Sequence, residues 1–327
     1  MENQTSLKNS IFKSSATQKL LAFSSLLLLV VIFSIASPNF FTQSNIKSIL
    51  LATAVNGVLA VGVTFVIITG GIDLSIGTVM TFSSVAAGVF ITMWGLPTWL
   101  GLIGAILAGS LCGFINGFNV ARFKIPAFIA TLGMMMITKG LSLVFSDAAP
   151  IYFTNAKLTK HIKFSDISTG IVLGVPNAVI IFFVVAILAG IILNYTLLGR
   201  YNFAIGSNEE ATRLSGVNTD RWIIAIHTLT GAFCGIAGIL MASRLNSAQP
   251  ALGQGYELDA IAAVVIGGTS LSGGKGTILG TIIGAFIMSV LINGLRILSV
   301  PQDRQTVITG IIVIVAVIVD VARRNKK

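Results

Sequence analysis

The chain has 327 residues, of which 54% are hydrophobic and only 10% are charged. A soluble globular chain usually carries about 25% charged residues, so a soluble fold is excluded, and disorder is excluded because disordered segments are rich in charge and poor in apolar residues. The net charge of +10 does not indicate nucleic-acid binding, because the basic residues lie mainly in short gaps between apolar runs and not on one face of a soluble fold.

Ten apolar segments follow one another along the chain and are predicted to be membrane-spanning helices. A helix needs roughly 17–25 apolar residues to cross a bilayer. The sequence therefore predicts an all-α fold: a polytopic integral membrane protein with about ten transmembrane helices, some of them broken or re-entrant. In chain order the segments lie at about 20–36, 49–69, 76–93, 99–120, 126–145, 177–198, 222–243, 258–270, 277–294 and 306–322.

The first segment, residues 20–36, follows a tail that carries Lys8, Lys13 and Lys19. A cleaved signal peptide is the alternative, since Ser34-Ile35-Ala36 has the small-x-small pattern of a cleavage site. The 17 residues of the segment exceed the usual signal-peptide core of about 7–15 residues. We therefore expect a retained membrane anchor.

A short element occurs twice, at residues 70–75 and at residues 267–272, and four of its six positions are identical. Each copy follows an even-numbered segment and leads into an apolar helix, so the copies are expected to run parallel. Internal symmetry with glycine-interrupted hydrophobic segments is typical of transporters.

Three carboxylates lie at or near membrane depth: Asp73, Glu257 and Asp259. An ionised carboxylate is costly there unless it is paired or hydrated. One interpretation places them in a solvated translocation pathway, or in a gate paired with a cation such as Arg244. The alternative is helix capping, because all three lie at predicted helix starts, where acidic side chains are favourable.

Residues 199–221 form the longest predicted cytoplasmic loop and contain the signature of a short helix. Asn208 is a good N-cap, residues 209–214 would form the helix, and Gly216 would end it. A short amphipathic helix between two spans is expected to dock into a groove on a cytoplasmic partner. A solvated connector is the alternative.

The eighth segment, residues 258–270, is the weakest of the ten. Only about nine uncharged residues separate Asp259 from Gly268, too few to cross a bilayer alone. A re-entrant segment would place the basic residues 323–327 outside the cell, whereas Lys and Arg are enriched on the cytoplasmic side. We therefore expect this segment to cross, either intact or broken.

Charge distribution predicts that both termini are cytoplasmic. Cytoplasmic segments would then hold 13 Lys and Arg residues and extracytoplasmic segments seven, which follows the positive-inside rule. The predicted organisation is a cytoplasmic tail at 1–19, a transmembrane domain at 20–322 and a cytoplasmic basic tail at 323–327.

The sequence offers no means of binding ATP, a metal or a cofactor. Lys275 is followed by Gly276, not by the Ser or Thr that completes a phosphate-binding loop. His161 and His227 lack Cys, Asp or Glu neighbours at ligand spacing, and no hydrolase motif occurs. We expect no cofactor and no catalytic residue.

Residues 199–216 resemble the cytoplasmic coupling segment of sugar-importer permeases of the ABC superfamily. The same family pattern occurs at residues 70–77, 247–250 and 255–271, and the resemblance extends over nearly the whole chain, from about residue 20 to 322. Two positions depart from the pattern. Gly70 replaces the Ser of some relatives, and Thr212 replaces the Ala of much of the family.

The resemblance implies a permease domain at 20–322 in the bacterial inner membrane, with a second permease copy, a periplasmic sugar-binding protein and a cytoplasmic ATPase as partners. The chain itself would be a transport subunit and not an enzyme. Within the ribose, xylose and galactose importers, ribose is the expected sugar. By resemblance, residues 206–216 contact the ATPase. Glu210 and Arg213 are expected as surface contacts and Gly206 and Gly216 as backbone-shape residues, in a set that comprises Gly206, Asn208, Glu209, Glu210, Arg213 and Gly216.

Two other functions compete with this one. A partner-independent, ion-coupled secondary transporter or channel would use Asp73, Glu257 or Asp259 as its coupling site. An intramembrane enzyme lacks any catalytic set. Dependence on a separate ATPase distinguishes the first alternative from the importer. The loop at 147–176, with Lys157, Lys160 and Lys163, is a candidate contact for the binding protein or, alternatively, a solvated loop.

Overall fold

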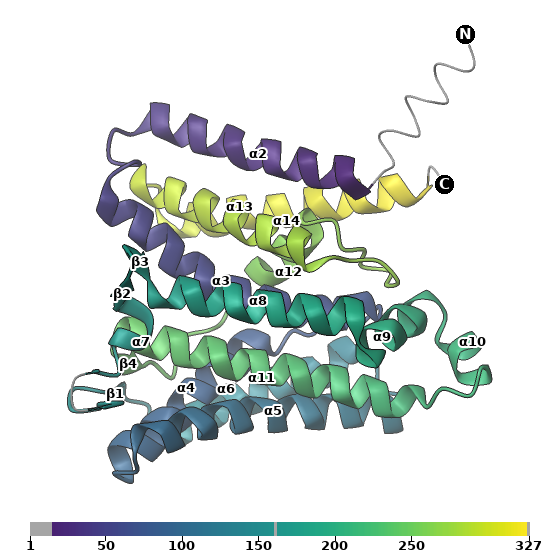
Figure 1. Ribbon diagram of the computed structural model, residues 1–327, viewed down its shortest axis with the longest axis horizontal. Helices are drawn as coiled ribbons and strands as arrows, with labels where there is room; N and C mark the ends of the chain where they lie inside the picture. The colour runs from purple at the N-terminus through teal and green to yellow at the C-terminus, as the bar shows by residue number, and fades with distance from the viewer. Residues whose placement is uncertain (1–14, 160–161, 326–327) are drawn as a thin grey trace.

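The computed structural model describes residues 15–159 and 162–325, and its long helices run side by side along one common direction (Figure 1). Seven helices in this part of the chain are long and apolar enough to cross a membrane, which confirms an all-α, polytopic membrane protein. They are α3 (Gln43–Ile68), α4 (Ile76–Gly88) with the π-helical turn η1 (Val89–Met93), α5 (Thr98–Arg122), α6 (Ala127–Phe145), α8 (Asn177–Tyr195), α11 (Thr219–Leu245) and α13 (Ile278–Ile297).

The remaining described elements flank or connect these seven helices. Four two-residue strands form two antiparallel pairs, β1 with β4 and β2 with β3, and both pairs lie at the end of the bundle opposite to α10 (Figure 1). The helices are α2 (Ser15–Ala36), α7 (Asp166–Thr169), α9 (Leu197–Ser207), α10 (Glu209–Leu214), α12 (Tyr256–Ile266) and α14 (Gln302–Asn325), and the strands are β1 (Ile151–Tyr152), β2 (Ile171–Val172), β3 (Val175–Pro176) and β4 (Ser247–Ala248).

The two ends of the described chain lie on the same side of the bundle. Figure 1 shows that α2 begins and α14 ends at the end that also carries α10. Along its length α2 packs against α13, where Phe33 is buried in a small core cluster. Lys8 and Lys13 of the predicted N-terminal tail and Lys326 and Lys327 of the basic tail lie outside the described residues.

The weak eighth segment is a broken element. Its helical part, α12, has 11 residues and is therefore only about 16 Å long, at a rise of 1.5 Å per residue. A non-helical stretch, a two-residue strand followed by turns, precedes it. Ala248 pairs with Ile151 at the strand-bearing end, and the Leu252 carbonyl then accepts a hydrogen bond from Thr81 Oγ1 at 2.8 Å. After α12 the chain reaches the opposite end, where Gly267 abuts Gly280 at the start of α13. The helix occupies 256–266 instead of the predicted 258–270, because its first turn includes the polar pair Tyr256 and Glu257 and it ends before Gly267 and Gly268, the latter with a φ of +93°.

Close backbone approach between α5 and α11 depends on small residues. Gly109, Gly113 and Gly117 repeat at four-residue spacing along the contact. A Cβ on Gly109 would overlap the Gly231 carbonyl oxygen, and one on Gly113 would overlap the His227 carbonyl oxygen. Any side chain there would force the two backbones apart.

The two copies of the repeated element meet at the end of the bundle that carries α9 and α10. The first copy follows α3 and the second precedes α13. Gly274 N–H donates to the Ile68 carbonyl oxygen at 2.8 Å, and a Cβ on Gly70 would lie 3.6 Å from the Ser272 carbonyl oxygen. Each turn joins a helix that ends there to a helix that begins there, so the copies run in the same direction, as predicted.

Candidate functional site

The segment between α8 and α11 folds into two short helices at one end of the bundle (Figure 1). Thr196 has an extended conformation that ends α8, and its side chain caps α9 by accepting a hydrogen bond from Gly199 N–H. Asn208 is extended as well and separates α9 from α10. Two extended caps thus turn the chain twice and place α10 beyond the ends of the spans.

The predicted helix after Asn208 is confirmed. Asn208 Oδ1 accepts a hydrogen bond from the Ala211 N–H at 2.9 Å, which satisfies one of the free N–H groups of the first turn. The helix ends at Leu214, and Gly216 follows with a φ of +88°. Gly216 N–H donates to the Arg213 carbonyl oxygen at 3.0 Å, so the glycine closes the C-terminal turn in a conformation that a side chain disfavours.

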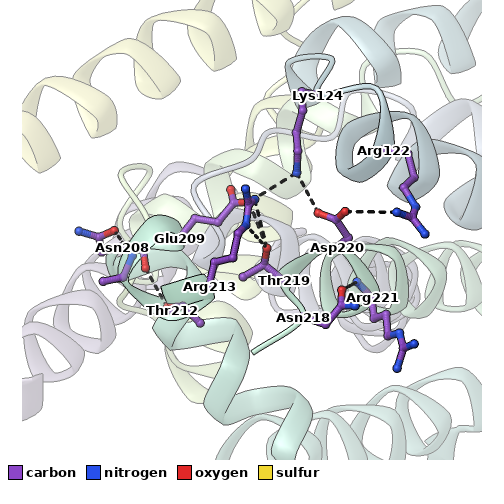
Figure 2. Close-up of polar contacts among 11 residues, drawn as sticks. Arg122, Lys124, Asn208, Glu209, Thr212, Arg213, Asn218, Thr219, Asp220 and Arg221 are labelled. Carbon is purple, nitrogen blue, oxygen red and sulfur yellow. Dashed lines mark hydrogen bonds and ion pairs between the residues drawn. The ribbon is translucent and has the colours of Figure 1, made fainter. Parts of the chain in front are cut away.

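One face of α10 is held to the start of α11 by hydrogen bonds among Glu209, Arg213 and Thr219, which we call the brace (Figure 2). Glu209 Oε1 accepts from Arg213 Nη2 at 2.6 Å and from Thr219 Oγ1 at 3.3 Å. Arg213 Nε also donates to Thr219 Oγ1, at 3.4 Å. The guanidinium predicted as a surface contact therefore also holds α10 to the start of α11, although 52% of the Arg213 side chain remains exposed.

A second set of charges extends this brace to the connection between α5 and α6 (Figure 2). Lys124 Nζ lies 2.8 Å from Asp220 Oδ1 and 3.8 Å from Glu209 Oε1. Arg122 Nη1 lies 3.8 Å from Asp220 Oδ2. Because such exposed pairs contribute only about 0–1 kcal/mol each, they orient α10 more than they stabilise the fold.

Apolar contacts fix α9 to the bundle. Ile205 is buried in a cluster with Ala121 of α5 and Ile223 of α11. The rings of Tyr201 and Trp222 lie 4.9 Å apart between centroids. These contacts link α9 to two long helices, α5 and α11.

Gly206, at the end of α9, contacts the end of the central helix α3. A Cβ at this position would overlap the Ile68 carbonyl oxygen and lie 2.6 Å from Gly274 N. Ile68 is the last residue of α3, which is buried at every position from residue 53 onward. The end of α9 thus rests on both the central helix and the turn that follows the second copy of the repeated element.

The opposite face of α10 is free. Glu210, Ala211 and Leu214 are exposed, Leu214 with 83% of its surface. Glu210 makes no hydrogen bond or ion pair with any other residue that the structure describes. Sequence reasoning did not select Leu214 as a contact residue, although a leucine four positions after Glu210 lies on the same helix face.

Asp73 is buried just before α4. Its Oδ1 accepts from Ser75 N–H at 2.9 Å and from Ser75 Oγ at 2.6 Å, and its Oδ2 lies 3.7 Å from His227 Nδ1. Asn116 Nδ2 also donates to Ser75 Oγ, at 3.0 Å. Asp73 thus faces His227 of α11, and a pairing with Arg244 is not seen among the described ion pairs.

Glu257 is buried in the first turn of α12. Its two carboxylate oxygens accept from the Gly255 N–H at 3.0 and 3.1 Å, and Oε2 packs against Gly77 of α4. Asp259 is half-buried in the same turn. Asp73 and Glu257 each accept a hydrogen bond from the backbone N–H of the residue that precedes a helix, but neither α4 nor α12 has a hydrogen bond to the side chain of its N-cap residue. A pathway role for the three carboxylates stays a prediction.

The loop at 147–176 packs on the strand-bearing end. The rings of Phe153 and Phe164 stack with centroids 4.1 Å apart, and Thr98 Oγ1 donates to the Lys157 carbonyl oxygen at 2.7 Å. Lys157 and Lys163 are exposed, while Lys160 lies outside the described residues. Contact of these lysines with a binding protein stays a prediction.

Comparison with known proteins places the chain in a family. The sequence profile of the family described as "Branched-chain amino acid transport system / permease component" matches residues 45–317. The chain is 43% identical to the ribose import permease protein RbsC of Escherichia coli K12, over 92% of each chain. Against RbsC of Bacillus subtilis the identity is 42%, over 93% of this chain and 92% of the relative.

A fructose import permease protein, FrcC of Rhizobium meliloti, is 38% identical over 86% of this chain and 79% of its own length. No solved structure matches the chain. The full-length similarity to permeases and the match to the family profile lead to one assignment. The chain belongs to this family of transport-system permease components, which makes it a transport subunit and not an enzyme.

Proposed function

We propose that the chain is the membrane-spanning permease subunit of an ATP-driven, binding-protein-dependent ribose importer in the bacterial inner membrane. Ribose import permeases from two distant bacteria match at 42–43% identity over almost the full length. The fructose import permease is less similar and covers less of the chain. This order favours ribose as the transported sugar.

The proposed topology has ten crossings with both termini in the cytoplasm. Seven crossings are the long apolar helices. The other three are α2, α14 and the broken element at 246–266, whose non-helical and helical halves together connect the two ends of the bundle. The basic residues near both ends of the chain support a cytoplasmic position for that side.

The single observation that carries the coupling proposal is the two-faced arrangement of α10. Its inner face is braced by Glu209, Arg213 and Thr219, and its outer face presents Glu210 and Leu214 without a partner in the described chain. An exposed leucine beside an unpaired charge on a rigid helix suits docking into a groove of another protein. We assign that partner as the cytoplasmic ATPase.

The contacts of Gly206 suggest how movement would pass from the ATPase to the pathway. A displacement of α10 would carry α9 with it, and α9 ends on Ile68 and Gly274. These two residues belong to the end of α3 and to the turn before α13. Rigid-body motion at this junction would then alter which side of the membrane the pathway faces.

The other partners are assigned to other surfaces. The loop at 147–176, at the end opposite to α10 (Figure 1), would face the periplasm and receive the sugar-binding protein. A second permease copy would complete the pathway. For the competing ion-coupled transporter, Asp73 and Glu257 already accept hydrogen bonds from backbone N–H groups beside helix starts, so Asp259 would be its remaining candidate.

Charge reversal at Glu210 tests the docking proposal. Glu210→Arg should lower ATP-driven ribose uptake by about 100-fold or more, because a misplaced like charge at an interface costs several kcal/mol. Glu210→Gln is the matched control and should retain most of the uptake. The amount of folded permease should be equal for both, since the side chain is exposed. Normal uptake by Glu210→Arg would contradict the assignment.

A further inference from the structure

A polar pair lies on the outer face of α6, at membrane depth. Lys139 is six residues from the end of α6 at Phe145, and its Nζ donates to Gln254 Oε1 at 3.2 Å. Gln254 lies in the turn just before α12 and is exposed, while Lys139 is half-buried. Neither residue has a role in the coupling segment.

The outer faces of neighbouring spans have a different character. On α5 the exposed side chains include Ile103, Leu107 and Leu111, and on α8 they include Ile187 and Leu188. Such apolar faces suit contact with lipid tails. A charged group on a lipid-facing surface is costly, and ionisable residues within spans usually face a water-filled cavity or another protein surface.

Helix α6 is the least buried of the seven long apolar helices in the described chain. Apolar side chains such as Met136 and Ile137 are exposed on it, as on α5 and α8. The pair formed by Lys139 and Gln254 is therefore a polar interruption of an otherwise apolar surface.

Lys139 lies well inside the predicted span. Six residues correspond to about 9 Å along a helix, and its ammonium group donates to Gln254 Oε1. An ammonium group has three donors and a glutamine side chain has donors and an acceptor. Only one hydrogen bond is made between them, and neither side chain bonds to any further described residue, so most of this capacity is free.

We propose that Lys139 and Gln254 line a water-filled translocation pathway and hydrogen-bond the hydroxyl groups of the transported solute. The chemistry suits a neutral, hydroxyl-rich molecule, because the pair combines strong donors with an amide acceptor and makes no contact with a carboxylate. The inference rests on the proposed permease function, with the second copy forming the other wall of the pathway.

Thiol labelling tests whether the surface around Lys139 and Gln254 is hydrated. Gln254→Cys in the membrane-embedded chain should react with a charged, membrane-impermeant methanethiosulfonate, because only a hydrated thiolate is nucleophilic. Leu107→Cys on α5 is the matched control and should stay unlabelled because it faces lipid. Leu214→Cys on α10 is the positive control and should react in membrane fragments that are accessible from both sides. The native Cys112 and Cys234 are buried and should give no background. The proposal would be overturned if the thiol at position 214 reacts, the thiol at position 107 does not react, and the thiol at position 254 does not react either.

Transport by Lys139 variants tests the solute contact. Lys139→Met removes the donor at similar length and should reduce the ribose uptake rate by about tenfold, the effect of one lost charged hydrogen bond, while Lys139→Arg should retain more. Met136→Leu, on the same face, should transport normally. Full uptake by Lys139→Met would reject the contact. Labelling at position 254 needs no ATPase, so its result does not depend on the importer assignment. A failure of the importer assignment would instead be recognised because uptake would not require ATP.

Discussion

At the scale of single residues, the two glycines of the coupling segment are required for different physical reasons. Gly216 has a φ of +88°, and a Cβ there would meet no atom within 4 Å. Gly206 needs its missing side chain because the Ile68 carbonyl oxygen fills the place of a Cβ. The first glycine shapes a turn, and the second permits a contact with the central helix.

The two glycines therefore predict different substitution effects. Gly216→Ala should cost about 1 kcal/mol of stability and leave uptake close to normal. Gly206→Ala should displace α9 from Ile68 and abolish most ATP-driven uptake. Thermal unfolding in detergent and uptake in vesicles measure the two effects. Equal losses for both variants would contradict the proposed contact between α9 and α3.

Sequence reasoning identified part of this site correctly. The Asn208 cap and the helix after it follow from local side-chain chemistry, so the sequence predicts them. The brace between Arg213 and Thr219 depends on where α11 begins in space, which local patterns do not specify. For the same reason His227 was not recognised as the neighbour of Asp73, since 154 positions of chain separate the two residues.

At the scale of elements, α10 is a six-residue helix that is too short to be stable by itself. Its cap and its contacts with Thr219 and Lys124 hold it in place. The coupling segment thus combines a fixed inner face with an unpartnered outer face. Under the proposed coupling, the contacts of the inner face would transmit a displacement of the outer face to the helices of the bundle.

Removal of Glu209 should loosen this element without touching the outer face. Glu209→Ala deletes the acceptor for Arg213, Thr219 and Lys124, and should destabilise α10 by about 0.5–1 kcal/mol. Hydrogen exchange of the amides at 209–214 should accelerate. Glu210→Ala is the matched control and should leave exchange unchanged. If both variants exchange at the native rate, the brace does not order α10.

The broken element shows why the predicted spans were incomplete. Apolar periodicity finds continuous helices, and it predicts 126–145 where the structure has α6 at Ala127–Phe145. It does not detect the non-helical residues 246–255, which form a short strand and turns, pair with β1 and accept a hydrogen bond from Thr81 Oγ1. In α3 the helix begins at Gln43 instead of residue 49, since polar residues extend it beyond the apolar run.

At the scale of the whole molecule, the repeated element, the central helix and the coupling segment converge at one end. Ile68, Gly206 and Gly274 meet there, and each belongs to a different part of the chain. The internal repeat was visible in the sequence, but the contact between its copies was not. This convergence is the physical basis for proposing that a partner at α10 controls access to a pathway between the helices.

Reconstituted transport tests the central claim most directly. Ribose uptake would be measured in proteoliposomes that contain this chain, with and without its ATPase subunit, loaded binding protein and ATP. We predict uptake only when all the components and ATP are present. Uptake by this chain alone, driven by a proton or sodium gradient, would contradict the importer and point to Asp73, Glu257 and Asp259 as the coupling site.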